Sequence, residues 1–472
     1  MLSKLNKIFS SPKHCVLAFF LISIILYSIF IFILNTPFSY DEGTYSLMVK
    51  EFTDNPTRVM PTVTGVYVGW KPPLFTWVYS IFYFFLKNFN FSPETTMRLP
   101  SAFFGALCVS FIYLIANKLY GVKVAFASAM LSITTPGLIF ASSLIMMEAF
   151  SLFLILAAIY FYLRKNFLGG MFFLFLLVLT KWLYVIVPIL FVLLYFLKDK
   201  DLKKIIASFF VVPISIAIYF VIASLFADVN SVFLNYSLDI SRITPSLDLL
   251  VVVLMSEWVF FFLFPMSCLF VFFLFSKKFD LWKDKHLLAT ALLAFMFPLF
   301  QHPLFWYAII SLPTMIILVS KKMCEILNDD KLLIFLLFGM LFINAEIFVT
   351  YPFSGYDEGT KDIANFMKGK NVAFFETHSF YSNWEQINLA YINTSKSYLL
   401  LEQIHPGILF YRFNDTDDYY NLHAVFARNE GAIDCHSEYL VVHGENITVP
   451  ECFELIFKKS KFSVYTVSNS AS

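Results

Sequence analysis

The sequence predicts a polytopic membrane protein, all α-helical over its first 350 residues, with a small C-terminal α/β or α+β domain. Of its 472 residues, 59% are hydrophobic and only 14% are charged, and the mean hydropathy is +0.73. Soluble domains carry about 25% charged residues. A water-soluble domain could not bury this much apolar surface, so lipid must solvate most of the chain. The net charge of +1 gives no bulk attraction to nucleic acid.

The membrane domain is expected to contain about eleven spanning helices, since a span needs about 20 apolar residues. The segments are 16–34, 99–119, 123–143, 149–163, 167–180, 182–197, 205–227, 249–275, 287–300, 304–320 and 332–350. The apolar stretch 73–87 is expected to lie on the outer face, because most Lys and Arg of the loops then fall on one side. By the positive-inside rule that side is cytoplasmic. The N-terminus is therefore predicted inside, and the first loop (35–97) and the C-terminus outside.

The composition changes near residue 351, which divides a membrane domain (1–350) from a C-terminal domain (351–472). The second domain contains no spanning run and has short alternating patches such as Asn371–Phe375, which are typical of strands. Cys435 and Cys452 are candidates for a disulfide if this domain lies outside. Three N-glycosylation sequons in it agree with that location.

Two adjacent acids, Asp41 and Glu42, open the first loop just past the membrane boundary. One interpretation is structural, because the helix macrodipole favours acids in a first helical turn. The same pentapeptide, Tyr-Asp-Glu-Gly-Thr, recurs at 356–360 before another helical pattern, which strengthens the structural interpretation. The other interpretation is a carboxylate base at the lipid–water interface.

The loop closes with Lys71, followed by two prolines that are suited to a first helical turn. Its ammonium group would project at the interface, where a lipid phosphate lies. The alternative is a snorkelling lysine among interfacial tryptophans. Arg98 follows at the outer end of the second span.

Together these motifs resemble the GT-C superfamily of membrane glycosyltransferases. The most similar branch contains bacterial aminoarabinose transferase and the dolichyl-phosphate-mannose–protein mannosyltransferases. The resemblance rests on Tyr40-Asp41-Glu42, Lys71-Pro72-Pro73-Leu74 and Arg98-Leu99-Pro100-Ser101, and continues to Leu179-Thr180-Lys181. It covers roughly the first 200 residues, whereas the later spans match only in layout and the C-terminal domain hardly at all.

The resemblance implies an inverting transfer of sugar from a polyprenyl- or dolichyl-phosphate carrier at the outer face. Asp41, with Glu42 beside it, would act as the catalytic base. Lys71 would contact the donor phosphate, and Arg98 and Lys181 are further candidates for that contact. Arg98 has a structural alternative as an ion-pair partner for the loop.

Two further site candidates lie farther along the chain. Relatives often carry an arginine-containing stretch followed by an acid after the third or fourth span, and here Glu148 supplies an acid without the arginine. Acids at membrane depth are rare and usually functional, so Glu148 is a candidate second carboxylate. His302 could contact the donor, with an interfacial structural role as an equal alternative. No metal motif is present, and a divalent ion held by carboxylates stays open.

The expected function is therefore a membrane glycosyltransferase with a polyprenyl-phosphate-linked sugar donor. Its acceptor could be a protein, a glycan or a lipid. A transporter is one alternative, but its spans should carry ionisable residues and show two similar halves, and neither feature is seen. A catalytically inactive scaffold is the other alternative, against which the intact pair Asp41-Glu42 argues.

Overall fold

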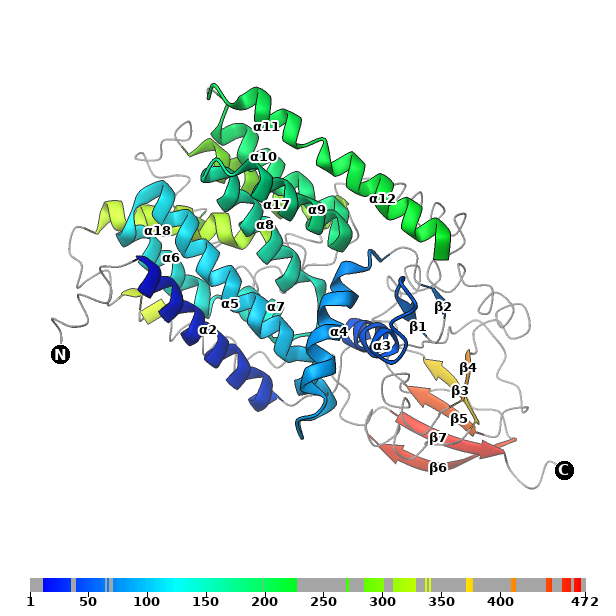
Figure 1. The fold of residues 1–472 in the computed structure, drawn as a ribbon. Helices are drawn as coiled ribbons and strands as arrows, with labels where there is room; N and C mark the ends of the chain where they lie inside the picture. The colour runs from blue at the N-terminus through cyan, green and yellow to red at the C-terminus, as the bar shows by residue number, and fades with distance from the viewer. Residues whose placement is uncertain are drawn as a thin grey trace.

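The computed structural model places a helical bundle beside a smaller β-sheet (Figure 1). The structure describes residues 12–34, 40–63, 66–67, 71–197, 199–226, 269–270, 284–300, 309–327, 336–337, 339–340, 371–376, 409–412, 439–443, 452–459 and 462–467. The remaining residues are outside the description that follows.

The first half of the bundle follows the order of the predicted apolar runs. Its elements are α2 (Pro12–Leu34), α3 (Tyr40–Asp54), β1 (Thr62–Val63), β2 (Val66–Tyr67), α4 (Leu74–Leu86), α5 (Pro93–Tyr120), α6 (Val122–Thr134), α7 (Pro136–Ser143) and α8 (Met147–Leu163). The later elements are α9 (Phe167–Lys181), the 3₁₀ turn η1 (Trp182–Val185), α10 (Ile186–Tyr195), α11 (Leu202–Ser208), α12 (Val211–Phe226), α17 (Lys285–Phe300) and α18 (Leu312–Ile326).

Several of these helices are long and apolar enough to cross a bilayer, which makes the chain a multi-pass integral membrane protein. Among the described residues, four helical runs meet this condition: Pro12–Ile33, Pro93–Tyr120, Phe167–Tyr195 and Leu202–Phe226. The pair α6 and α7, expected as one span over 123–143, is a fifth candidate that bends by 60° between its halves. Most of the spans expected at 249–275 and 332–350 lies outside the described residues, and the described part of the span expected at 304–320 begins at residue 309 and includes the start of α18.

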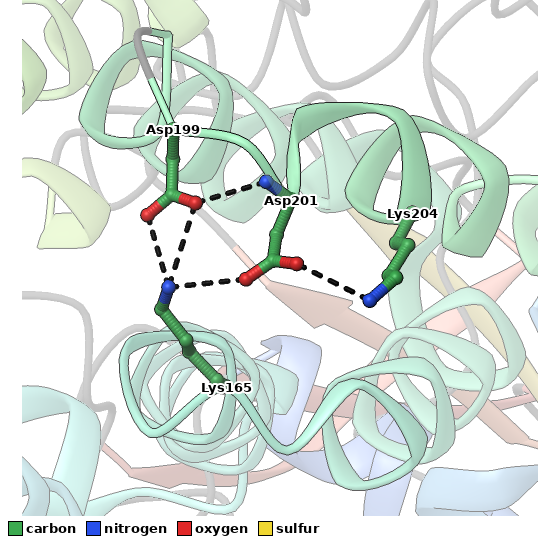
Figure 2. A network of polar contacts seen from close by, with 4 residues as sticks. All are labelled: Lys165, Asp199, Asp201 and Lys204. Atoms are coloured by element: carbon green, nitrogen blue, oxygen red, sulfur yellow. Dashed lines mark hydrogen bonds and ion pairs between the residues drawn. The ribbon is translucent and has the colours of Figure 1, made fainter.

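The run Phe167–Tyr195 reverses direction at Lys181, whose backbone leaves the helical region with φ −156° and ψ 85°. At the start of α9, the Lys165 ammonium donates to Asp199, which follows α10, over 3.1 Å (Figure 2). The chain has therefore returned by residue 199 to the end of the bundle where α9 begins. This agrees with the two separate segments expected at 167–180 and 182–197.

Helix α5 is the centre of the bundle and packs against α2, α6, α7 and α8. Its Gly105 allows a close approach of α7, since a Cβ at this position would lie 2.0 Å from the Ser142 hydroxyl oxygen. Much of the described core is built of such tight helix contacts between small and aromatic residues. Within the first loop, the Trp77 indole of α4 donates to the Val59 carbonyl over 2.8 Å.

Far along the chain from the first loop, α5 meets α17 and α18 through a buried polar cluster. Asp284 accepts hydrogen bonds from the Tyr120 hydroxyl and the Lys321 ammonium, and it is 1% exposed. Lys123 of α6 donates to the Leu327 carbonyl over 3.4 Å. Lys123, Lys165, Lys204 and Lys321, which the predicted topology places on the cytoplasmic side, take part in these contacts and in the network around Lys165.

The described part of the C-terminal domain is a five-stranded mixed sheet in the order β4-β3-β5-β7-β6. Its strands are β3 (Asn371–Glu376), β4 (Leu409–Arg412), β5 (Tyr439–His443), β6 (Phe453–Lys459) and β7 (Phe462–Val467). Strands β3 and β5 are parallel, and the other pairs are antiparallel. The strand predicted at Asn371–Phe375 is confirmed as β3. Cys452, beside β6, is disulfide-bonded.

Candidate active site

Glu42 and Arg98 form a buried bidentate ion pair between α3 and α5. The Arg98 Nε and Nη2 atoms donate to the two carboxylate oxygens of Glu42, each over 2.7 Å. The two side chains are 0% and 1% exposed, respectively. Two parallel charge-assisted bonds of this kind fix both direction and distance. The sequence alternative for Arg98, an ion-pair partner for the loop, is therefore the arrangement that the structure contains.

Glu42 also fixes the linker between α7 and α8. The Ile145 backbone N–H donates to Glu42 Oε1 over 3.1 Å. The carboxylate therefore accepts from α5 and from residues 144–146 at once, and it joins three parts of the fold. This geometry gives Glu42 a positioning role beside its expected role next to the base.

Asp41 precedes Glu42 in the first turn of α3, so its backbone position follows from the Glu42 contacts. The position of its side chain lies outside the described part of the structure. Tyr45 follows Asp41 by four residues, and in a helix this spacing puts two residues on the same face, about 5–6 Å apart at Cβ. Positions 41 and 45 are therefore neighbours on one face of α3.

Lys71 contacts Tyr45. Its ammonium donates to the Tyr45 hydroxyl over 3.1 Å and lies 5.3 Å from the centre of the Tyr45 ring. The Tyr45 ring in turn packs edge-on against Phe75 in the first turns of α4. The prolines after Lys71 begin this helix as expected, with Pro73 at its N-cap. Lys71 and Asp41 thus belong to one corner of the bundle, where α3 meets α4.

Glu148 and Lys181 form a second ion pair. The Lys181 ammonium lies 2.8 Å from Glu148 Oε1 and 4.3 Å from the centre of the Tyr184 ring. The Glu148 side chain is 3% exposed, and its second oxygen, Oε2, has no hydrogen-bond partner among the described residues. Glu148 also lies within electrostatic range of Tyr79 in α4.

The two ion pairs lie on one short segment. Helix α7 ends at Ser143 and α8 begins at Met147, and the linker contacts Glu42 through Ile145 just three residues before Glu148. The linker thus couples the α3–α5 pair to the α8–α9 pair. The described candidates, Glu42, Lys71, Arg98, Glu148 and Lys181, gather where α3, α4, α5, α8 and α9 meet.

His302 lies outside the described residues. Within the described side chains, which do not include that of Asp41, no three His, Cys, Asp or Glu side chains gather in a way that could hold a metal ion.

Sequence reasoning missed two parts of this region. The contact of Tyr45 with Lys71 is one of them, and the spacing of four residues between Asp41 and Tyr45 was the available signal for it. The backbone N–H of Ile145 carries no side-chain signal, so only the fold reveals its contact with Glu42.

Comparisons with known proteins agree with the predicted fold. No protein-family model matches the chain, and no curated protein sequence matches it. The structure is similar to ArnT of Cupriavidus metallidurans bound to undecaprenyl phosphate, with a TM-score of 0.58, 13% identity and coverage of 97% of this chain and 98% of ArnT. The apo form of the same protein gives a TM-score of 0.56 at 12% identity, covering 96% and 98% of the two chains.

An oligosaccharyltransferase of Archaeoglobus fulgidus also matches, with a TM-score of 0.49, 16% identity and coverage of 74% of this chain and 55% of that protein. The similarity to ArnT spans nearly the whole of both chains, including the C-terminal domain that the sequence resemblance hardly covers. The chain therefore shares the fold of ArnT along almost its entire length.

Proposed function

We propose that this protein is an inverting glycosyltransferase that takes sugar from a polyprenyl-phosphate carrier. The observation that carries the proposal is the end-to-end similarity to ArnT, one of whose structures contains undecaprenyl phosphate. The position of Lys71, on the same corner as Asp41, supports it further. A transporter would not account for this similarity.

In the proposed reaction, Asp41 removes a proton from a hydroxyl or amine of the acceptor as that group attacks the anomeric carbon. The new glycosidic bond forms while the bond between the anomeric carbon and the phosphate oxygen breaks. The electron pair leaves with the polyprenyl phosphate, and the acceptor proton ends on Asp41. Attack in line with the leaving phosphate inverts the configuration of the anomeric carbon.

Lys71 supplies the positive charge that the leaving phosphate needs. The Tyr45 hydroxyl accepts one of its three N–H bonds and fixes the direction of the ammonium group. A cation held in advance stabilises developing negative charge without reorganising at the moment of reaction. Arg98 takes a different part in the proposal, because Glu42 already engages its guanidinium group.

We place the site on the extracytoplasmic face. The lysines of the Asp284 cluster and of the Lys165 network lie away from the site, which fits a cytoplasmic location for that end. The disulfide at Cys452 fits a C-terminal domain in an oxidising compartment. The acceptor is a hydroxyl or amine of a protein, a glycan or a lipid.

The test of the base is Asp41→Asn, assayed in membranes with radiolabelled polyprenyl-phosphate sugars. The matched control is Asp357→Asn, which makes the same change in the second copy of the pentapeptide. Loss of a general base lowers a rate by about 10²- to 10⁴-fold. We expect this loss for Asp41→Asn with normal membrane insertion, and wild-type transfer for the control. Unchanged transfer by Asp41→Asn would remove it as the base.

The phosphate contact is tested by Lys71→Ala, with Lys87→Ala as the control lysine at the other end of α4. A hydrogen bond to a charged group is worth about 1.5–3 kcal/mol. We therefore expect undecaprenyl phosphate to bind roughly 10- to 100-fold more weakly to the Lys71 variant and with wild-type affinity to the Lys87 variant. Equal affinities would exclude Lys71 as the phosphate partner.

The orientation is tested with single cysteines in two exposed positions, Thr57→Cys in the first loop and Lys203→Cys in α11. A membrane-impermeant maleimide applied to intact cells should label the first variant and spare the second. The reverse pattern would place the site inside.

A further inference from the structure

The candidate site contains equal numbers of acidic and basic side chains. Its acids are Asp41, Glu42 and Glu148, and its bases are Lys71, Arg98 and Lys181. The sequence leaves open whether the carboxylates hold a divalent ion. The pairing of these charges in the described contacts bears on whether such an ion can bind.

Two of the three carboxylates already have cationic partners. Both Glu42 oxygens accept from Arg98, and Oε1 also accepts from the Ile145 N–H. Glu148 Oε1 lies 2.8 Å from the Lys181 ammonium. Divalent ions such as Mg²⁺ and Mn²⁺ bind oxygen ligands that bring uncompensated negative charge. A divalent ion on Glu148 Oε2 would lie across one carboxylate from Lys181, and the two cations would repel each other at this largely buried pair.

We propose that Lys181 is a built-in cation that takes the place of a divalent metal ion in this site. Glu148 Oε2, buried and without a partner among the described residues, then accepts a hydrogen bond from a hydroxyl or amine of the donor sugar. Sugar transfer is accordingly independent of divalent cations. This inference rests on the proposed function for its ligand, but its charge argument concerns the protein alone.

Lys181 is held in a way that suits this role. Its ammonium lies over the Tyr184 ring, 4.3 Å from the ring centre, and its side chain is 16% exposed. An aromatic face attracts and orients a desolvated cation. The η1 turn that begins just after Lys181 supplies Tyr184, so the reversal of the chain between α9 and α10 fixes the cation against Glu148. We classify Lys181 as a positioning residue.

The inference is tested by binding of Mn²⁺ to purified protein that has first been stripped with EDTA, measured by electron paramagnetic resonance. Wild-type protein should show no Mn²⁺ site that depends on Glu148. Lys181→Met should gain a stoichiometric site, with affinity raised at least tenfold, and Lys181→Met/Glu148→Gln should lose it. Lys50→Met is the matched control, because it frees an acid, Asp54, from an exposed pair on α3.

Stoichiometric Mn²⁺ binding by wild-type protein that Glu148→Gln abolishes would overturn the inference. So would a folded Lys181→Met variant that gains no site, since Lys181 would then not be what excludes the ion. As a second readout, EDTA should leave the affinity of wild-type protein for undecaprenyl phosphate unchanged, and a drop that Mn²⁺ restores would also overturn it. Failure to bind undecaprenyl phosphate under every condition would instead count against the proposed function.

Discussion

Removing one partner of the Glu42–Arg98 pair should destabilise the fold more than most surface changes to this chain. Both side chains are excluded from solvent, and each carboxylate oxygen accepts a 2.7 Å bond from the guanidinium group. Glu42→Gln removes the carboxylate that both Arg98 bonds reach, and Arg98→Met removes the guanidinium group from a buried carboxylate that also accepts from the Ile145 N–H. Breaking a buried pair in this way costs about 3–5 kcal/mol.

The double variant Glu42→Gln/Arg98→Met leaves no buried charge in the pair. Replacing both members of a buried ion pair is often close to neutral, so the double variant should be no less stable than either single variant. The free energy of unfolding can be measured for all four proteins by titrating SDS into detergent micelles. The matched control is Asp54→Asn, because the Lys50–Asp54 pair is exposed and of the i,i+4 type, worth about 0.3–0.5 kcal/mol.

The same series separates stability from positioning. If the pair holds the linker 144–146 in place, the double variant should keep its fold yet transfer sugar more slowly than the wild type. If Glu42→Gln shifts the unfolding free energy no more than Asp54→Asn does, the pair is not a buried tie between α3 and α5. Losses in the two single variants that simply add in the double variant would refute the reasoning as well, because independent sites add and coupled ones do not.

Three further outcomes are expected. Tyr45→Phe removes the hydroxyl that orients Lys71, and should weaken binding of undecaprenyl phosphate by up to roughly tenfold without changing the unfolding temperature; a fold loss instead would make Tyr45 purely structural. Cys452 should react with a mass-tagged maleimide only after reduction, and Cys435→Ser should free it; labelling of Cys452 without reduction would contradict the disulfide. The pKa of Asp199 is lowered, first by the hydrogen bond from the Asp201 backbone N–H and second by Lys165. The contribution of the ionised Asp199 to stability is therefore present above its unfolded pKa and is lost only in acid. The effect of Lys165→Met on unfolding temperature should therefore be small and constant between about pH 5 and 9, and a strong change near neutral pH would contradict this.

Apolar run length predicted much of the bundle, but not its bends. The segment 123–143 was long enough for one helix, and the structure contains α6 and α7 with a 60° bend between them. Thr135 at the break has the extended backbone (φ −65°, ψ 122°) that a following proline favours. Pro136 also lacks the N–H needed to continue the helix. The proline is visible in the sequence, but the size of the bend depends on how α7 packs against α5.

The site residues could be found singly from the sequence, but not their pairing. Glu42 and Glu148 were expected from their chemical type and their position at the membrane boundary, and Arg98 and Lys181 from the resemblance to GT-C enzymes. Glu42 and Arg98 are 56 residues apart, and Glu148 and Lys181 are 33 apart. Which acid pairs with which base depends on which helices pack together, and the hydrophobic periodicity of the sequence does not specify this packing. The resemblance to GT-C enzymes predicted the order of the motifs along the chain, and the structure shows which of their residues are in contact.

The repeated pentapeptide illustrates that a short sequence motif takes its role from the fold around it. Tyr-Asp-Glu-Gly-Thr can start a helix in either copy, and nothing within the five residues distinguishes them. In the first copy, α5 brings Arg98 to the glutamate and the α7–α8 linker brings a backbone N–H to it. In the proposed reaction the two adjacent acids have different tasks. Glu42 already accepts from Arg98 and from the Ile145 N–H, so the proposal gives it a positioning role and assigns the proton transfer to Asp41. Two consecutive carboxylates on one helical turn would then combine a fixed acid with the base that it holds in place.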